Sequence, residues 1–149
     1  MNYVFDTTSR KRYTFPTHIN DLVIDRANAV ASEVFVVIVE PGKATHLHQH
    51  ADVEQIFYVL EGRGVLTIGR GRNEYSVEPS QVVKIPPSTL HTIRAKGKKA
   101  LRYLCIDCFC PERKNDEATW DVHVRGICKE QGYVFEDVIG ASSRGRKRR

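Results

Sequence analysis

The sequence predicts an all-β domain of the sandwich or barrel type, followed by a helix. Two observations carry this prediction: short segments rich in β-branched and aromatic residues recur at nearly regular spacing, and glycine or proline turn signals separate them. The expected strands are 22–24, 33–40, 44–50, 55–60, 65–68, 73–77, 81–85, 90–94 and 100–109. A chain of 149 residues with 41% hydrophobic content can bury the core that such a domain needs.

Beyond the last expected strand, the sequence predicts a helix over residues 116–131. Asn115 or Asp116 can cap its first turn, and Gly132 can end it. One face of this helix is apolar and consists of Trp120, Val124, Ile127 and Cys128. We expect that face to pack on the barrel or on a partner subunit, whereas His123 lies off it and is expected to be solvated.

We divide the chain into an N-terminal arm (1–20), a barrel (21–110), a helix with its extension (111–140) and a basic, disordered tail (141–149). The net charge is +5, but five of the 23 basic residues lie in the tail, so 18 basic residues balance 18 acidic ones elsewhere. Nucleic-acid binding is therefore not expected. There is no apolar stretch of membrane-spanning length and no signal-peptide core, and the four cysteines fit reduced thiols, so we expect a cytoplasmic location without membrane association.

Three histidines provide the first functional signal. His48 and His50 are two residues apart, so in a strand their imidazoles point to the same face. His91 follows the Pro86-Pro87 turn and enters another expected strand. Neutral imidazoles suit zinc, nickel, copper and iron, so this arrangement predicts a metal-binding site.

Residues 21–110 resemble the cupin superfamily, whose members are small barrels of antiparallel strands with a metal site inside. The first cupin motif, G-x5-H-x-H-x(3,4)-E-x6-G, reads Gly42, His48, His50, Gln55 and Gly62 in this chain. The second motif, P-x-G-x2-H-x3-N, reads Pro86, Ser88, His91 and Ala95. The resemblance implies a double-sheet jelly-roll barrel, one divalent metal ion (Zn, Ni, Mn or Fe), a small-molecule substrate and a homodimer.

The chain departs from the first motif where an acid is expected. Counting back from Gly62 places Gln55 there, whereas Glu54 fits the variable gap after His50. Neighbouring residues of a strand face opposite sides, so only one of the two can enter the barrel with the histidines. The spacing to Gly62 favours Gln55, whose amide oxygen can bind a metal. The expected metal ligands are therefore His48, His50, Gln55 and His91, with Glu54 as the alternative to Gln55.

The alternation of strand faces also suggests pocket residues. His46 and Phe57 share the parity of the expected ligands, which makes His46 a candidate proton carrier and Phe57 a candidate substrate contact. The last expected strand leaves two alternatives open. Either Tyr103 and Asp107 enter the barrel as an acid–base pair, or Arg102 enters it and binds a carboxylate or phosphate of the substrate.

The amide at position 55 also bears on the reaction. Three neutral imidazoles and an amide leave a divalent ion more positive than a site with a carboxylate would, which favours Lewis-acid chemistry over the oxidation of iron. We therefore expect non-redox chemistry (isomerisation, ring opening, cyclisation or elimination) on a small oxygenated molecule such as a sugar acid or a polyketide. An Fe(II) dioxygenase and a non-catalytic cupin that binds a small molecule are the alternatives.

Overall fold

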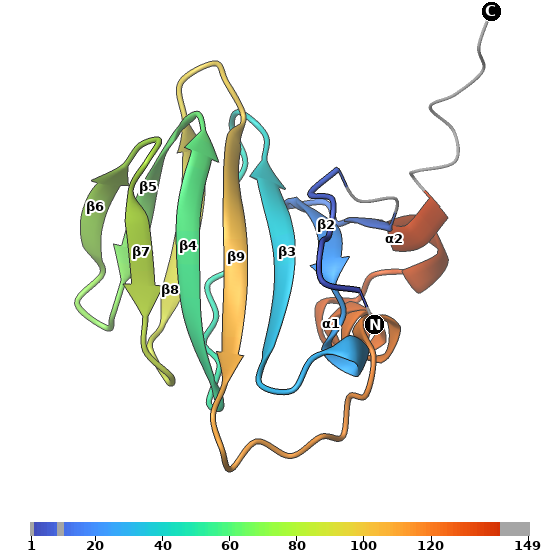
Figure 1. Ribbon diagram of the computed structural model, residues 1–149. Helices are drawn as coiled ribbons and strands as arrows, with labels where there is room; N and C mark the ends of the chain where they lie inside the picture. The colour runs from blue at the N-terminus through green and yellow to red at the C-terminus, as the bar shows by residue number, and fades with distance from the viewer. Residues whose placement is uncertain (1, 9–10, 141–149) are drawn as a thin grey trace, which may run out of the picture.

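The structure is a computed structural model that describes residues 2–8 and 11–140 (Figure 1). Its strands are β1 (Arg12–Thr14), β2 (Ile19–Ile24), β3 (Ser32–Val39), β4 (Val53–Glu61), β5 (Arg63–Ile68), β6 (Asn73–Val77), β7 (Val82–Ile85), β8 (His91–Lys96) and β9 (Leu101–Phe109). A 3₁₀ turn (Arg26–Asn28) follows β2, and the helices α1 (Trp120–Gln131) and α2 (Phe135–Gly140) follow β9. The expected disordered tail, 141–149, lies outside the described residues.

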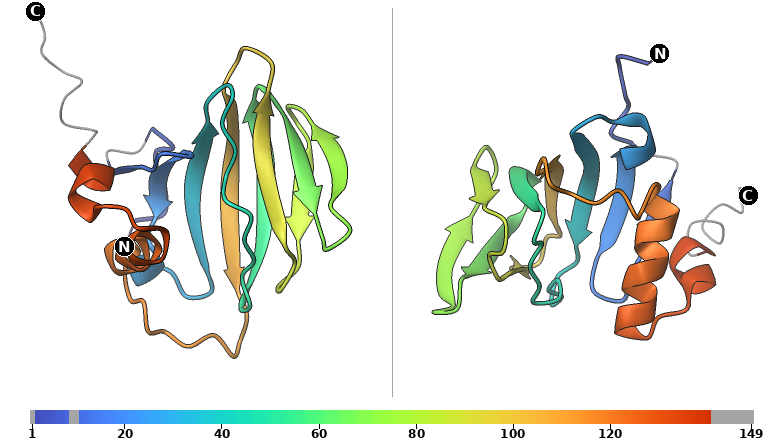
Figure 2. Two further views of the ribbon diagram at one scale, coloured as in Figure 1. Left: turned by 180° about the vertical axis from the view of Figure 1, so that it is seen from behind. Right: turned by 90° about the horizontal axis from the view of Figure 1, so that it is seen from below.

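The strands form two antiparallel sheets. The large sheet has the order β1-β2-β3-β9-β4-β7, and the small sheet has the order β6-β5-β8. Figure 1 shows the large sheet in front of the small one, and Figure 2 shows both helices beside the β1–β2 end of the large sheet. The predicted all-β jelly-roll barrel with a C-terminal helix is confirmed. Neither α1 nor α2 has the length and hydropathy that a membrane-spanning helix requires.

The central strands alternate between a buried inner face and a more exposed outer face. In β9, the buried residues are Leu101, Tyr103, Cys105 and Asp107. In β4, the buried residues are Val53, Gln55, Phe57 and Val59. A period of two is what a sheet produces when one face packs on the core. The inner faces of β4 and β9 therefore supply side chains to the interior of the barrel.

Residues 44–50 do not form the expected strand. The segment pairs with β8 only through two isolated bridges, Ala44 with Arg94 and His48 with His91. Ala44 and His48 are four positions apart, whereas their partners Arg94 and His91 are only three positions apart, so no continuous ladder forms between the two segments. The backbones of His48 and His91 still exchange two hydrogen bonds, with N–O distances of 3.1 and 2.9 Å. These bonds hold the histidine segment against β8.

Helix α1 begins later than predicted. Its N-cap is Thr119, whose hydroxyl accepts a hydrogen bond from the amide of Val122. Asn115 and Asp116 belong to the irregular segment that leads from β9 to the helix (Figure 1). Gly132 ends the helix in the left-handed conformation, as predicted.

The end of the large sheet near β1 is closed by an aromatic cluster. Trp120, the first residue of α1, is 1% exposed, which confirms its expected place in the core. Its ring centroid lies 4.7 Å from that of Phe35 and 5.5 Å from that of Tyr13. Residues of the expected N-terminal arm thus form β1 and part of β2, and α1 packs on them.

Candidate metal centre

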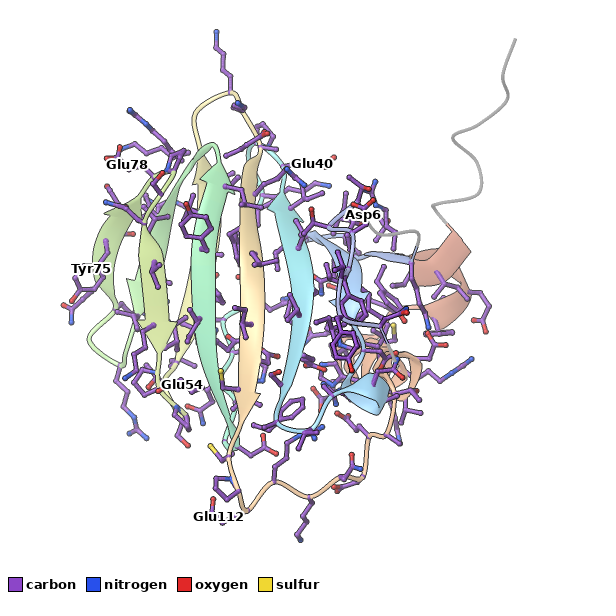
Figure 3. All side chains as sticks on the ribbon, viewed as in Figure 1. Asp6, Glu40, Glu54, Tyr75, Glu78 and Glu112 are labelled. Carbon is purple, nitrogen blue, oxygen red and sulfur yellow. The ribbon has the colours of Figure 1, made fainter. Side chains whose placement is uncertain are left out.

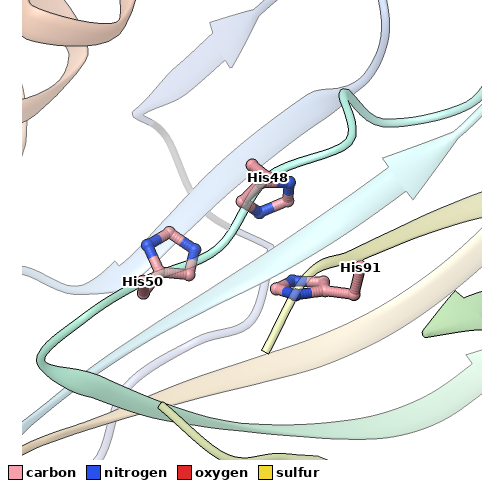
Figure 4. A group of neighbouring side chains, drawn as sticks. All are labelled: His48, His50 and His91. Atoms are coloured by element: carbon pink, nitrogen blue, oxygen red, sulfur yellow. The ribbon is translucent and has the colours of Figure 1, made fainter. Parts of the chain in front are cut away.

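Three imidazoles point toward one another inside the barrel (Figure 4). His48 and His50 come from the irregular segment before β4, and His91 is the first residue of β8. One ring nitrogen of each histidine lies within 4.8 Å of the corresponding nitrogen of the other two. The backbone bridge between His48 and His91 explains this proximity, because directly opposed residues of an antiparallel pair send their side chains to the same face.

Hydrogen bonds to the backbone fix the tautomers of two of these rings. His48 Nδ1 lies 2.6 Å from the carbonyl oxygen of His46, and His91 Nδ1 lies 2.8 Å from that of Thr89. A carbonyl oxygen only accepts, so each Nδ1 carries the hydrogen and each Nε2 keeps its lone pair. Metal-binding histidines commonly have a hydrogen bond of this kind on the nitrogen that faces away from the ion.

Burial keeps all three rings neutral at pH 7. Burial, together with the neighbouring histidines, lowers the pKa of His50 to about 3 and that of His91 to about 4. The pKa of His48 is lowered as well, mainly by burial. Neutral imidazoles with free lone pairs are the form that binds a divalent metal.

Gln55 enters the barrel beside the histidines, and its amide orientation is fixed. Its Nε2 donates a hydrogen bond of 2.9 Å to Oδ1 of Asp107, so its Oε1 is left as an acceptor. That oxygen is buried and has no hydrogen-bond partner. Buried polar atoms without a partner cost about 1–3 kcal/mol each, so a structure that keeps one needs a reason.

The unpaired atoms test whether a metal fits here. Among the described residues, the buried side-chain nitrogen and oxygen atoms without a partner are Asn20 Oδ1, His50 Nε2, Gln55 Oε1, His91 Nε2 and Trp120 Nε1. Three of these atoms belong to the histidine cluster and to Gln55, and each can offer a lone pair. Imidazole nitrogens and an amide oxygen suit zinc, nickel or iron. A divalent ion held by the histidines would satisfy Nε2 of His50 and of His91, and Oε1 of Gln55 is a further buried acceptor in the same cavity, so the residues fit a metal.

A cavity of about 500 Å³ opens in front of this cluster. Four of the predicted pocket residues line it: His46, Phe57, Tyr103 and Asp107. This volume lies within the usual range for small-molecule sites. The four expected metal ligands, His48, His50, Gln55 and His91, line the same cavity. Of all the predicted site residues, only Glu54 and Arg102 are absent from its lining.

Glu54 and Arg102 lie on the outer face of the large sheet. Glu54, labelled in Figure 3, has its carboxylate 3.5 Å from Nζ of Lys84. The guanidinium of Arg102 lies 3.8 Å from the carboxylate of Glu61. Glu54 precedes the buried Gln55 in β4, and Arg102 precedes the buried Tyr103 in β9. Neighbouring side chains of a strand point to opposite faces, so neither Glu54 nor Arg102 reaches the cavity. The expectations that Glu54 enters the barrel or that Arg102 contacts substrate are therefore corrected.

A buried network of acids lies behind Gln55. Glu33 is opposite Asp107 in the β3–β9 pair, and both are at most 5% exposed. Arg26 donates two hydrogen bonds to Glu33, of 2.8 and 2.9 Å. Burial and the neighbouring Glu33 raise the pKa of Asp107 well above its ordinary value. Arg26 therefore neutralises Glu33, and Asp107 remains as the polar partner of Gln55.

Several cavity residues were not predicted from the sequence. His18 and Asn20 come from the N-terminal region and line the cavity, and Tyr133, from the turn after α1, contacts the cavity residue His46. The hydroxyl of Tyr133 lies 2.6 Å from Nε2 of His46. His123 was expected to be solvated, but it lines the cavity and its Nδ1 lies 2.7 Å from a carboxylate oxygen of Glu117. Only the tertiary packing brings these distant segments to one cavity, so local spacing carries no signal for them.

The fold and the site define a known class of protein. Residues 35–107 match the family described as the cupin domain. This match falls on a jelly-roll barrel with three histidines at the two motif positions, so the barrel of this chain is a cupin domain.

Two curated relatives and one solved structure illustrate its similarities. The chain is 36% identical over 80 residues to the uncharacterized protein MJ1618 of Methanocaldococcus jannaschii, covering 54% of this chain and 61% of that protein. It is 31% identical over 84 residues to 1-methylthio-D-xylulose 5-phosphate methylsulfurylase of Rhodospirillum rubrum, covering 56% of this chain and 52% of the enzyme. The polyketide cyclase RemF of Streptomyces resistomycificus shares the fold, with a TM-score of 0.65 at 20% identity over 79% of this chain and 91% of that one.

Proposed function

We propose that the protein is a metal-dependent enzyme that carries out non-redox chemistry on a small oxygenated molecule of the sugar-acid or polyketide type. The observation that carries the proposal is the convergence of unpaired acceptors: Nε2 of His50, Nε2 of His91 and Oε1 of Gln55 are buried without partners in one cavity. His48, His50, Gln55 and His91 would hold the ion. Neutral ligands leave its full charge available, so it would act as a Lewis acid toward a substrate oxygen.

The other residues of the cavity would bind the substrate and move protons. Burial raises the pKa of Tyr103 well above its ordinary value, so the phenol keeps its proton and can donate it to a substrate oxygen. Phe57 packs on Tyr103 with ring centroids 4.5 Å apart and provides an apolar wall. His46 and Tyr133, joined by their 2.6 Å contact, would exchange a proton near the cavity, and Asp107 is a further candidate acid–base residue.

The curated relative with a known activity supports a sugar-type substrate. Its name specifies 1-methylthio-D-xylulose 5-phosphate, and it is 31% identical to this chain over the matched residues. The matched part covers about half of that enzyme, 52%, so its substrate is a guide to chemical class. A homodimer and a cytoplasmic location complete the proposal, and analytical ultracentrifugation of the purified chain tests the dimer.

The metal content of the protein tests the central claim. We expect about one zinc, nickel, manganese or iron ion per chain by elemental mass spectrometry after purification without added metal. Gln55→Ala should lower this ratio, and Glu54→Ala should leave it unchanged, because Glu54 lies outside with Lys84. A metal ratio near zero in the wild-type protein would overturn the proposal.

Turnover distinguishes the reaction classes. We expect a change in the ¹H NMR spectrum of one member of a panel of sugar acids, sugar phosphates and lactones, with no requirement for oxygen. Stoichiometric iron together with oxygen uptake would instead identify a dioxygenase. Bound metal without turnover of any compound would favour a cupin that only binds its ligand.

A further inference from the structure

Within residues 2–8 and 11–140, two of the five unpaired buried side-chain atoms are not explained by a metal: Oδ1 of Asn20 and Nε1 of Trp120. Both residues line the same cavity as the histidines, and they are 5% and 1% exposed. We propose that Asn20 and Trp120 form a second subsite, which binds the uncharged, hydroxylated end of a sugar-type substrate. This inference rests on the proposed function, because it narrows the substrate class of that cavity.

Asn20 and Trp120 belong to one wall of the cavity. Asn20 on β2 is the cross-strand partner of Tyr13 on β1, so their side chains share the inner face. The ring of Trp120 packs on the ring of Tyr13 with centroids 5.5 Å apart. Tyr13 therefore connects the strand that carries the unpaired acceptor to the helix that carries the unpaired donor.

This wall is separate from the metal centre but continuous with it. Asn20 is on β2 and Gln55 is on β4, with β3 and β9 between them. The side chains of both strands nevertheless line one cavity of about 500 Å³, together with Trp120 and the three histidines. One sugar-sized ligand in this cavity can therefore contact the metal centre and this wall.

The chemistry of the two atoms selects the ligand. Oδ1 of Asn20 only accepts and Nε1 of Trp120 only donates, whereas a hydroxyl group can do both. A carboxylate or phosphate dianion has no proton for Asn20, and an apolar ring would leave both atoms unpaired at a cost in affinity. A site built around buried polar groups rejects analogues that lack the matching hydroxyl. A neutral polyol end thus fits this wall better than an anionic or flat apolar one.

A matched pair of ligands tests the subsite. D-glucuronate and cyclohexanecarboxylate both have a six-membered ring and one carboxylate, but only the first has hydroxyl groups. Isothermal titration calorimetry of the zinc-loaded full chain should show tighter binding of D-glucuronate. Because Trp120 is the only tryptophan of the chain, its fluorescence should change with the same dissociation constant.

Two variants test whether the tighter binding of D-glucuronate depends on Oδ1 of Asn20 and on Nε1 of Trp120. Asn20→Leu removes the acceptor at similar volume and should weaken D-glucuronate about tenfold, the loss expected for one buried hydrogen bond. Trp120→Phe keeps an aromatic ring but removes the N–H group, and calorimetry should show a loss of similar size. Both variants should bind cyclohexanecarboxylate within about twofold of the wild-type protein. Thermal unfolding of each variant checks that it is folded, and either variant alone suffices for the test.

The results that overturn the subsite are distinct from those that overturn the metal site. Equal affinity of the wild-type protein for the two ligands, no binding of D-glucuronate, or an unchanged preference in a folded variant each refutes the subsite. The zinc-to-protein ratio is measured on the same samples, and both variants should keep the wild-type ratio. A wild-type protein without zinc refutes the metal site, while its preference between the two ligands still decides the subsite.

Discussion

Nε2 of Gln55 lies 2.9 Å from Oδ1 of Asp107, and this bond leaves Oε1 as the unpaired acceptor of the buried amide. An amide has a donor end and an acceptor end of nearly equal size, and only the acceptor can bind a metal. Asp107 engages the donor end, so Oε1 remains for the ion. The chain thus replaces the carboxylate of the first cupin motif with a neutral amide and places a buried carboxyl group behind it.

Asp107 should therefore affect metal affinity although it is not an expected ligand. Asp107→Leu removes the acceptor for Gln55 and should weaken zinc binding about 10–100-fold, the range found when a hydrogen-bond partner of a ligand is lost. Asp107→Asn is the matched control, because its side-chain oxygen can still accept from Gln55. Competition with a chromogenic chelator measures both affinities. Equal zinc affinities in the two variants would contradict the positioning role.

Arg26 should be important for stability. Its side chain is 5% exposed and forms a double hydrogen bond with Glu33, which is fully buried. Arg26→Met leaves the carboxylate of Glu33 buried without a counter-charge, and it should lower the free energy of unfolding by about 3–5 kcal/mol. The exposed pair of Lys43 and Glu40 provides the control, and Lys43→Met should cost at most about 1 kcal/mol. Urea unfolding followed by fluorescence measures the free energy of unfolding of both variants. A similar decrease in the two variants would argue against a special role of the buried Arg26–Glu33 pair.

Gly62 should tolerate no side chain. Its φ is +73°, and a Cβ atom there would collide with the backbone carbonyl oxygen of Ala100. Gly42 has a similar φ of +78° but open space around it. Gly42→Ala should cost about 1–2 kcal/mol for the left-handed backbone alone, and Gly62→Ala should cost more because the chain must also move. Equal losses in urea unfolding would show that the close approach to Ala100 is not limiting.

The carboxyl group of Glu117 should make stability depend on pH in the acid range. The hydrogen bond from His123, together with Arg26, lowers its pKa from 4.5 to about 2 in the folded protein. A lowered pKa means that ionised Glu117 stabilises the fold above pH 4.5, and that this contribution is lost as the pH falls toward 2. Glu117→Gln should therefore show a smaller loss of stability than the wild-type protein between pH 5 and 3. The free energy of unfolding is measured with urea at each pH for both proteins. The same pH dependence in the variant and in the wild-type protein would refute this assignment.

Local sequence determined the parts of this protein that depend on spacing along one strand. The regular spacing of short segments rich in β-branched and aromatic residues, with turn signals between them, predicted the strands, and the positions of His48, His50 and His91 predicted that three imidazoles meet. Counting from Gly62 selected Gln55 over Glu54, and the structure places Gln55 inside and Glu54 outside. The choice of Gln55 succeeds because side chains of β4 alternate with a fixed period of two. The three imidazoles meet although 44–50 is not a strand, because the isolated bridge holds His48 opposite His91.

The tertiary structure decided everything that depends on contacts between distant segments. Parity alone left Tyr103 and Arg102 as alternatives, and only the pairing of β9 with β3 and β4 fixed which of them faces the core. The one-residue mismatch against β8 turned the expected strand at 44–50 into an irregular segment. Asn20, Gln55 and Trp120 lie far apart in the sequence, and they line one cavity because the packing of β1, β2 and α1 closes the end of the barrel. Such contacts leave no periodic trace in the sequence, which is why the second polar wall of the cavity could be found only in the folded protein.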